Sequence, residues 1–132
     1  MNLLGKILAV FSRKPRHIIK GMEGEELAKK HLKAKGFMIL ERNFRIRGGE
    51  ADIIASTGER TVVVEVKTRT TERFGPPQAA VDRRKFRRLV LAGTVYCRMK
   101  NIPVSSLRID VIAIQMKGKE TTIRHFENIG QP

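Results

Sequence analysis

The sequence predicts a single α/β domain built on a mixed β-sheet, with helices and strands in the order α-β-β-β-α-β-β. Two segments carry apolar side chains at three- and four-residue spacing, which is typical of amphipathic helices. Five shorter segments, bounded by turn residues, have the composition of strands. The chain has 132 residues, of which 41% are apolar, and this fits one compact core better than two.

A short amphipathic helix is expected to precede this domain. Residues 1–20 contain five basic and no acidic side chains, and Pro15 is expected to end the helix. The apolar residues at helical spacing are Leu3, Leu4, Ile7, Leu8 and Phe11. Such a segment can lie on a membrane surface or bind a partner groove, but we favour the commoner case, in which it packs on its own domain. We assign residues 1–20 to a basic N-terminal extension and 21–132 to the domain.

The first helix of the domain is expected over residues 22–35. Acidic residues occupy its first turn and lysines its last, and Gly36 follows where a left-handed cap is favoured. The apolar spacing predicts a buried stripe of Gly24, Leu27, Ala28, His31 and Leu32. At about 100° per residue, Glu26 points away from this stripe whereas Glu25 borders it. Glu25 is therefore the acidic residue of this helix that can reach inward.

Strands and a second helix complete the expected order. Three strands follow the first helix, at residues 37–46, 50–56 and 61–68. The break Phe74-Gly75-Pro76-Pro77 then starts a helix that runs to about Met99. The apolar stripe of that helix is Phe86, Leu89, Val90, Gly93, Tyr96 and Cys97. The last two strands are expected at residues 107–116 and 120–127.

Two carboxylates are expected to meet in the second hairpin. If the second and third strands turn between Gly58 and Glu59, Asp52 lies directly opposite Glu65. The two Cβ atoms would then be about 5 Å apart. Like charges so placed are destabilising unless a cation or a proton lies between them. The pairing therefore predicts a site that needs positive charge.

Alternation along the third strand places Glu65 and Lys67 on one face and Val62, Val64 and Val66 on the other. With Asp52, these residues offer oxygen ligands for Mg²⁺ or Mn²⁺ and one ammonium group. That combination is suited to orienting a water against a phosphate, so the pattern predicts phosphodiester hydrolysis. The alternative is a surface ion pair between Glu65 and Lys67.

Glu50 lies two residues before Asp52 and on the same strand face. It is either a further outer ligand or a salt-bridge partner of Arg45 or Arg47. We favour the salt bridge.

The balance of charge indicates an anionic partner. Twenty-seven Lys and Arg against thirteen Asp and Glu give a net charge of +14, which favours nucleic acid. Basic residues of the second helix are expected to fan over its exposed side: Arg83, Arg84, Lys85, Arg87 and Arg88. Lys67, Arg69 and Arg73 lead into this run. Because only 5% of the residues are aromatic, we expect backbone contacts to double-stranded or branched DNA rather than base stacking.

Because Cys97 is the single cysteine, an intramolecular disulfide is excluded. Its place on the apolar stripe predicts a small core residue. A reducing compartment, and hence a cytoplasmic location, is expected. No apolar run approaches the ~20 residues that span a membrane, so no membrane-spanning helix is expected.

Several spaced motifs carry a family resemblance: Gly24-Glu25-Glu26-Leu27-Ala28, Glu41-Arg42-Asn43, Gly49-Glu50-Ala51-Asp52-Ile53-Ile54-Ala55, Val64-Glu65-Val66-Lys67-Thr68-Arg69 and Phe74-Gly75. With these motifs the chain resembles the YraN-like family of predicted endonucleases. That family lies in the PD-(D/E)XK (restriction-endonuclease-like) superfamily and is similar to Holliday-junction resolvases. The proline of the superfamily motif is absent here, because Ala51 precedes Asp52.

The resemblance implies a restriction-endonuclease-like core with a metal site formed by Glu25, Asp52 and Glu65. It also implies that Lys67 positions or deprotonates the attacking water. A Mg²⁺- or Mn²⁺-dependent DNA endonuclease follows from it, structure-selective on branched DNA and homodimeric, since resolvases cut two strands symmetrically. The sequence leaves open the alternative of a non-catalytic nucleic-acid-binding module on the same scaffold. An RNA- or ribosome-associated protein is a third alternative, supported by charge alone.

Overall fold

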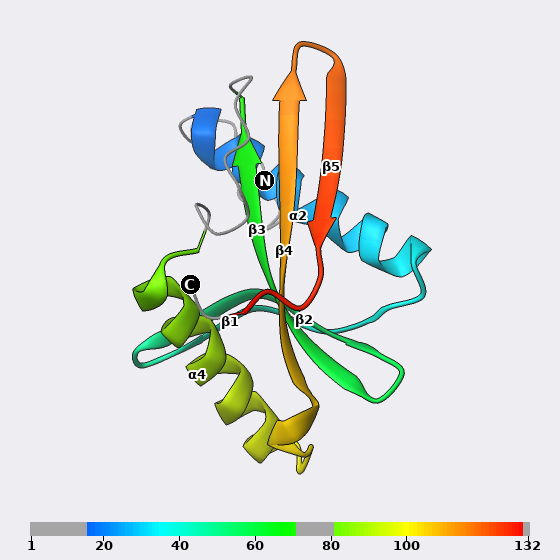
Figure 1. Cartoon of the computed structure of the whole chain (residues 1–132). Coiled ribbons are helices and arrows are strands. Elements are labelled where there is room, and N and C mark those ends of the chain that lie inside the picture. Colours follow the sequence, from blue (N-terminus) through cyan, green and yellow to red (C-terminus); the bar gives the residue numbers. More distant parts are fainter. Residues whose placement is uncertain (1–15, 71–80, 131–132) are drawn as a thin grey trace, which may run out of the picture.

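The structure is a computed structural model and describes residues 16–70 and 81–130 (Figure 1). The helix expected before Pro15, the break at residues 74–77 and the basic residue Arg73 lie outside the described residues. The elements are α2 (Arg16–Ala34), β1 (Met38–Ile46), β2 (Gly49–Thr57), β3 (Arg60–Arg69), α4 (Arg83–Met99), the short 3₁₀ helix η1 (Val104–Ser106), β4 (Leu107–Lys117) and β5 (Glu120–Phe126). This order confirms the α/β class and each of the five predicted strands.

The five strands form one mixed sheet in the spatial order β1-β2-β3-β4-β5. β3 and β4 run parallel, with α4 in the connection between them, whereas the other neighbouring strands pair antiparallel. Figure 1 shows β3, β4 and β5 side by side, with β5 running opposite to the other two, while the β1–β2 hairpin turns away from them. The sheet therefore opens at the point where β2 leaves β3.

Helix α2 begins at Arg16, six residues before the predicted start. Pro15 directly precedes it, and proline is tolerated at a helix N-terminus because its missing N–H has no partner there in any case. The prediction treated Pro15 only as the end of a preceding helix. The boundary drawn after residue 20 consequently falls inside α2. At the other end, Gly36 has a φ of 91° and terminates the helix as expected.

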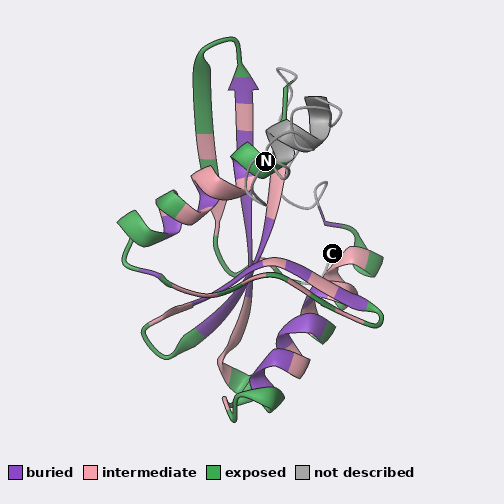
Figure 2. Cartoon of the chain, turned by 180° about the vertical axis from the view of Figure 1, so that it is seen from behind, coloured by how far each residue is buried: buried purple, intermediate pink, exposed green. Residues whose placement is uncertain are grey.

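The two helices cover opposite faces of the sheet. Ala28 and Leu32 of α2 pack against the face that carries Val62 and Val64, whereas Val63 lies in the cluster of α4. The alternation predicted for β3 is therefore confirmed. Figure 2 shows the buried residues along the strands and on the sides of the helices that face them.

Helix α4 buries four residues of its predicted stripe, which are Leu89, Gly93, Tyr96 and Cys97. Ala92 is buried as well, while Phe86 and Val90 are only half-buried. The helix ends at Met99 as predicted, and its N-cap is Asp82, whose side chain accepts a hydrogen bond from the backbone N–H of Lys85 at 2.8 Å. In the part of the chain that the structure describes, no helix has the length and apolar character needed to cross a bilayer.

The register of the β2–β3 hairpin is the predicted one from Thr57↔Arg60 to Ile53↔Val64. Backbone pairing ends there, one residue before the expected Asp52–Glu65 pair. Beyond this point each strand stays paired with its other neighbour, β2 with β1 as far as Gly49 and β3 with β4 as far as Arg69, and β2 and β3 diverge. Asp52 therefore lies at the fork between the two strands.

Candidate functional site

Asp52 is held at the fork by a backbone group of β3. Its Oδ2 accepts a hydrogen bond from the N–H of Val66 at 2.8 Å, so its carboxylate lies against β3 although the two strands no longer pair. Burial raises the pKa of Asp52, and the hydrogen bond from Val66 offsets that rise only in part. The Asp52 carboxylate is therefore costly to ionise in this environment.

Glu65 is a buried acidic residue at the fork whose ionised form is strongly disfavoured. Its side chain is buried, with 4% of its surface accessible, and its Oε2 has no hydrogen-bond partner among residues 16–70 and 81–130. Burial first, and the negative charge of Asp52 second, raise the pKa of Glu65 to about 7. The expectation that Asp52 and Glu65 share a site in need of positive charge agrees with this electrostatic coupling.

Lys85 of α4 supplies part of that charge. Its Nζ lies 2.9 Å from Oε1 of Glu50 and 3.5 Å from Oε1 of Glu65. The sequence analysis placed Lys85 on the exposed side of the helix, facing DNA. The helical period could have corrected this, because Lys85 precedes the buried residues Leu89 and Ala92 by four and seven positions and so shares their face.

Glu50 forms the salt bridge that we favoured, but with other partners. It binds Lys85 and approaches Nη2 of Arg88 at 3.9 Å, rather than Arg45 or Arg47 of β1. Gly49 explains the choice, because a Cβ at that position would lie 2.9 Å from the backbone oxygen of Arg88. The start of β2 thus touches the backbone of α4 and brings Glu50 within reach of its lysine.

Glu25 reaches the same region from α2. A Cβ at Gly24 would collide with Thr68 of β3, so the helix passes close to the sheet at this point. Glu25 has 22% of its side chain exposed; burial first and the charge of Asp52 second raise its pKa. Nη2 of Arg42 approaches its carboxylate at 3.9 Å. The inward orientation predicted for Glu25 is confirmed.

The three predicted acidic ligands do not form a tight cluster. Within the described residues, the ligand atoms of Glu25, Asp52 and Glu65 are not among the groups that lie within 4.8 Å of one another. The charge of Asp52 raises the pKa of both Glu65 and Glu25, although burial has the larger effect on each. The structure therefore presents two carboxylates at the fork, with a third beside them.

Lys67 is half-buried on β3, two residues beyond Glu65. Its positive charge lowers the pKa of both Asp52 and Glu65, although burial of those groups has the larger effect. The ion-pair partner of Glu65 is Lys85 and not Lys67, so the alternative of a simple Glu65–Lys67 surface pair does not describe this strand.

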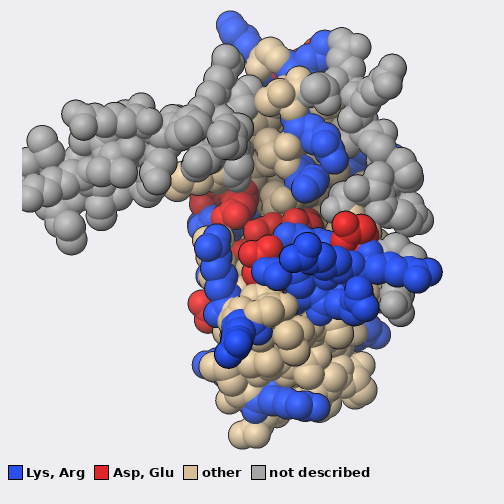
Figure 3. Space-filling model, turned by 90° about the vertical axis from the view of Figure 1, so that its left-hand side faces the viewer, with Lys and Arg blue, Asp and Glu red and all other residues tan. Residues whose placement is uncertain are grey.

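The predicted basic residues divide into two groups. Four are exposed, namely Arg69, Arg83, Arg84 and Arg87. Lys85 and Arg88 instead turn toward Glu50. Figure 3 shows acidic side chains gathered in one band of this face, with a dense group of Lys and Arg directly beside it.

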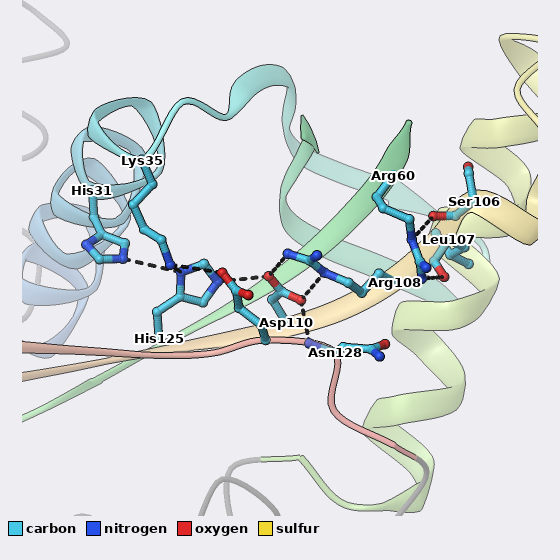
Figure 4. Close-up of polar contacts among 10 residues, drawn as sticks. His31, Lys35, Arg60, Ser106, Leu107, Arg108, Asp110, His125 and Asn128 are labelled. Carbon is cyan, nitrogen blue, oxygen red and sulfur yellow. Dashed lines mark hydrogen bonds and ion pairs between the residues drawn. The ribbon is translucent and has the colours of Figure 1, made fainter. Parts of the chain in front are cut away.

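A second polar cluster, absent from the sequence analysis, lies on the opposite side of the sheet. Ligand atoms of Asp110, His125 and Glu127 lie within 4.8 Å of one another (Figure 4). Asp110 is fully buried and accepts four hydrogen bonds of 2.8–2.9 Å, two from the guanidinium of Arg108 and one each from His125 Nε2 and the backbone N–H of Asn128. These donors occupy the four lone-pair sites that a carboxylate offers, so Asp110 has no capacity left for a metal.

The same cluster continues to α2. Nδ1 of His125 accepts from the ammonium of Lys35 at 3.1 Å and lies 3.3 Å from Nε2 of His31. Lys35 also donates to Glu127 at 2.9 Å. His31, which the apolar spacing predicts in the buried stripe of the first helix, is half-buried. The cluster therefore ties β4, β5 and the segment after β5 to the end of α2, which is a structural role.

Comparison with known proteins identifies relatives over most of the chain. Residues 24–114 match the model of "Uncharacterised protein family UPF0102". A UPF0102 protein of Geobacter metallireducens is 44% identical over 82% of this chain and 88% of its own length, and one of Pelobacter propionicus is 45% identical over 82% and 79%. A solved structure described as "Crystal structure of SSO0001" is 15% identical with a TM-score of 0.39 over 96% of this chain and 59% of that one, a similarity too low to establish a common fold. The chain belongs to UPF0102, the YraN-like family that its motifs resemble.

Proposed function

We propose that the protein is a divalent-cation-dependent endonuclease acting on DNA. The observation that carries the proposal is the buried Oε2 of Glu65, which has no hydrogen-bond partner within the described part of the chain and feels the negative charge of Asp52. A buried oxygen of this kind is destabilising unless a ligand satisfies it. The resemblance to PD-(D/E)XK nucleases independently assigns a metal to the same two residues.

The residues at the fork fit Mg²⁺ or Mn²⁺. All the donors are carboxylate oxygens, which these ions prefer, and Mg²⁺ is usually held by one or two carboxylates together with waters and substrate phosphates. Asp52 and Glu65 would hold the ion, and Glu25 would act from the outer side. When bound, the ion would neutralise phosphate charge and lower the pKa of a bound water.

Lys67 has a separate role in this proposal. An ammonium group cannot ligate a cation, but its three N–H donors can orient a water or stabilise charge that develops on a phosphate oxygen. Its position on β3, close enough to influence both carboxylates, is what such a role requires.

The exposed arginines favour DNA as the substrate. Arg83, Arg84 and Arg87 belong to the same helix that delivers Lys85 to the acidic residues, so a duplex bound to α4 would bring its phosphates toward the fork. Selectivity for branched DNA, and a homodimer that cuts two strands, are proposed from the resolvase resemblance.

Cleavage of a panel of linear, flapped and four-way-junction DNAs, in Mg²⁺, in Mn²⁺ and in chelator, tests the proposal. The parent protein is expected to cut with either ion and not with chelator. Asp52→Asn is expected to lose both metal binding and cleavage, whereas Glu59→Gln, in the exposed turn of the same hairpin, is the matched control.

Replacement of Lys67 separates catalysis from binding. Lys67→Ala is expected to retain metal and DNA binding but to cut 10²- to 10⁴-fold more slowly, roughly the range for loss of a positioned proton-transfer group. Lys119→Ala, an exposed lysine in the β4–β5 turn, is the control. Equal rates for the parent and Lys67→Ala would refute this mechanism. Tight DNA binding without cleavage of any substrate would instead favour the non-catalytic module.

A further inference from the structure

Lys85 connects the basic helix to the acidic fork in a way that neither motif nor charge predicted. Its ammonium lies between the carboxylates of Glu50 and Glu65, which come from different strands. Its side chain is 29% exposed, so the contact lies at the edge of the site rather than in bulk solvent.

Two backbone contacts fix the position of Lys85. Its backbone N–H donates to the N-cap residue Asp82, which anchors the first turn of α4. One turn further on, the close approach of Gly49 to Arg88 fixes the distance between α4 and β2. The lysine is thus held where its ammonium reaches the fork.

The two contacts of this ammonium are unequal. The 2.9 Å contact with Glu50 is a hydrogen bond, whereas the 3.5 Å contact with Glu65 exceeds the usual hydrogen-bond length. Lys85 therefore stabilises the ionised form of Glu65 without satisfying both of its oxygens, since Oε2 has no partner among the described residues. A smaller, doubly charged ion that contacts the carboxylate of Glu65 directly would stabilise it better.

We infer that Lys85 is the resident counter-ion of the fork: a divalent cation displaces its ammonium from Glu65, and Glu50 retains the displaced ammonium. The inference rests on the proposed function, because it requires that the cation bind at Asp52 and Glu65. It assigns Lys85 a role in controlling cation affinity and Glu50 a role that acts through Lys85.

Calorimetric titration of Mn²⁺ into the full chain tests this inference. Lys85→Met keeps the apolar stem and removes the charge, so it is expected to bind Mn²⁺ about tenfold more tightly, the scale on which a neighbouring unit charge alters binding of a proton. Arg88→Met is the control. Arg88 lies on the same helix and its guanidinium approaches Glu50, but among the described residues the ion-pair partner of Glu65 is Lys85 and not Arg88. The control substitution is expected to change the affinity less than threefold, roughly what a more distant, screened charge contributes.

Glu50→Gln is expected to change the Mn²⁺ affinity in the opposite direction. Without the carboxylate of Glu50, the ammonium of Lys85 is held more firmly by Glu65, so Mn²⁺ is expected to bind more weakly. In the Lys85→Met background the same substitution is expected to cost less affinity, because only the direct charge of Glu50 on Asp52 is then removed. An equal loss of affinity in both backgrounds would show that Glu50 does not act through Lys85, and this would overturn its assigned role.

Two further outcomes separate the inference from the proposed function. If neither the parent nor Lys85→Met binds Mn²⁺, there is no cation site at the fork and both statements are wrong. If both bind Mn²⁺ equally tightly, the site stands and the inference about Lys85 is refuted. Circular dichroism and thermal unfolding of each variant verify folding, and Lys85→Gln replaces Lys85→Met if the latter fails to fold.

Discussion

Asp110 and Glu65 lie on neighbouring strands, one residue apart in the β3–β4 pairing, and both carboxylates are buried. Burial alone would raise the pKa of Asp110, but hydrogen bonds from His125, Arg108 and the backbone of Asn128 lower it below its ordinary value. Glu65 has one cation at 3.5 Å and an unsatisfied oxygen, and its pKa is raised to about 7. The same sheet therefore carries one carboxylate with every partner supplied and one that lacks them.

This difference teaches how to distinguish a structural from a functional buried acid. Around Asp110 the chain itself supplies a guanidinium, an imidazole and a backbone donor, so nothing further is needed. At Glu65 the described part of the chain leaves the buried Oε2 without a hydrogen-bond donor. Proximity of ligand atoms does not distinguish the two acids, because the oxygens of Asp110 lie close to those of other ligands but are already satisfied.

Removal of Asp110 should have the largest effect on stability. Asp110→Asn leaves Arg108, whose side chain is only 14% exposed, without its full counter-charge and is expected to lower the free energy of unfolding by about 3 to 5 kcal/mol, as for other broken buried ion pairs. Urea unfolding measures this loss. A cost below about 1 kcal/mol, the scale of an exposed pair, would show that the cluster is not structural.

The pH dependence of the two acids should differ in sign. Because the pKa of Glu65 is raised from 4.5 to about 7, its contribution to stability is present below pH 4.5 and is lost as the pH rises through 7. The loss is expected to be about 3 kcal/mol at 1.36 kcal/mol per pKa unit. Asp110, whose pKa is lowered, contributes fully above its ordinary pKa of 3.8 and loses stability only in stronger acid.

Urea unfolding of the parent in chelator at pH 4.5 to 8 measures this slope. His31, whose pKa is lowered first by burial and then by the charges of His125 and Lys35, contributes a slope of opposite sign. The difference between the parent and Glu65→Gln cancels that contribution and isolates Glu65. A difference that does not change with pH would contradict the raised pKa.

Neutralising Glu65 should stabilise the apo protein. At pH 8 in chelator, Glu65→Gln is expected to raise the free energy of unfolding by about 1 to 2 kcal/mol, because it removes a buried charge that the chain does not satisfy. Glu59→Gln is the matched control and is expected to change stability by less than about 0.5 kcal/mol. Destabilisation by Glu65→Gln would indicate a structural acid like Asp110.

The smallest effect is expected at the edge of the Asp110 cluster. Lys35 and Glu127 form an ion pair in which 39% and 47% of the side chains are exposed. Lys35→Ala is therefore expected to cost about 0.2 to 1 kcal/mol by urea unfolding. A cost comparable to that of Asp110→Asn would extend the structural cluster to its exposed edge.

The sequence was sufficient to predict the strands, the hairpin register and the inward position of Glu25, because each depends on local periodicity. It did not predict where β2 leaves β3, since the two strands diverge while each stays paired with its outer neighbour, β1 or β4, and local periodicity does not show this. The direct Asp52–Glu65 pairing was accordingly replaced by a hydrogen bond from Asp52 to the backbone of Val66.

The Asp110 cluster could not be predicted from local pattern alone. Arg108 and Asp110 share a strand face at the same spacing as Glu65 and Lys67, and this is the one local signal. His125 joins only through the β4–β5 pairing, and His31 and Lys35 only through the packing of α2. The Arg108/Asp110 pair and the Glu65/Lys67 pair therefore have the same spacing but different hydrogen-bond partners, which come from segments distant in sequence.

Anomalous diffraction from crystals of the full chain grown with Mn²⁺ tests the central claim most directly. The account predicts a peak at the fork, about 2 Å from carboxylate oxygens of both Asp52 and Glu65, and no peak near Asp110. A peak at Asp110, His125 and Glu127 with none at the fork, or no peak at either cluster, would contradict it.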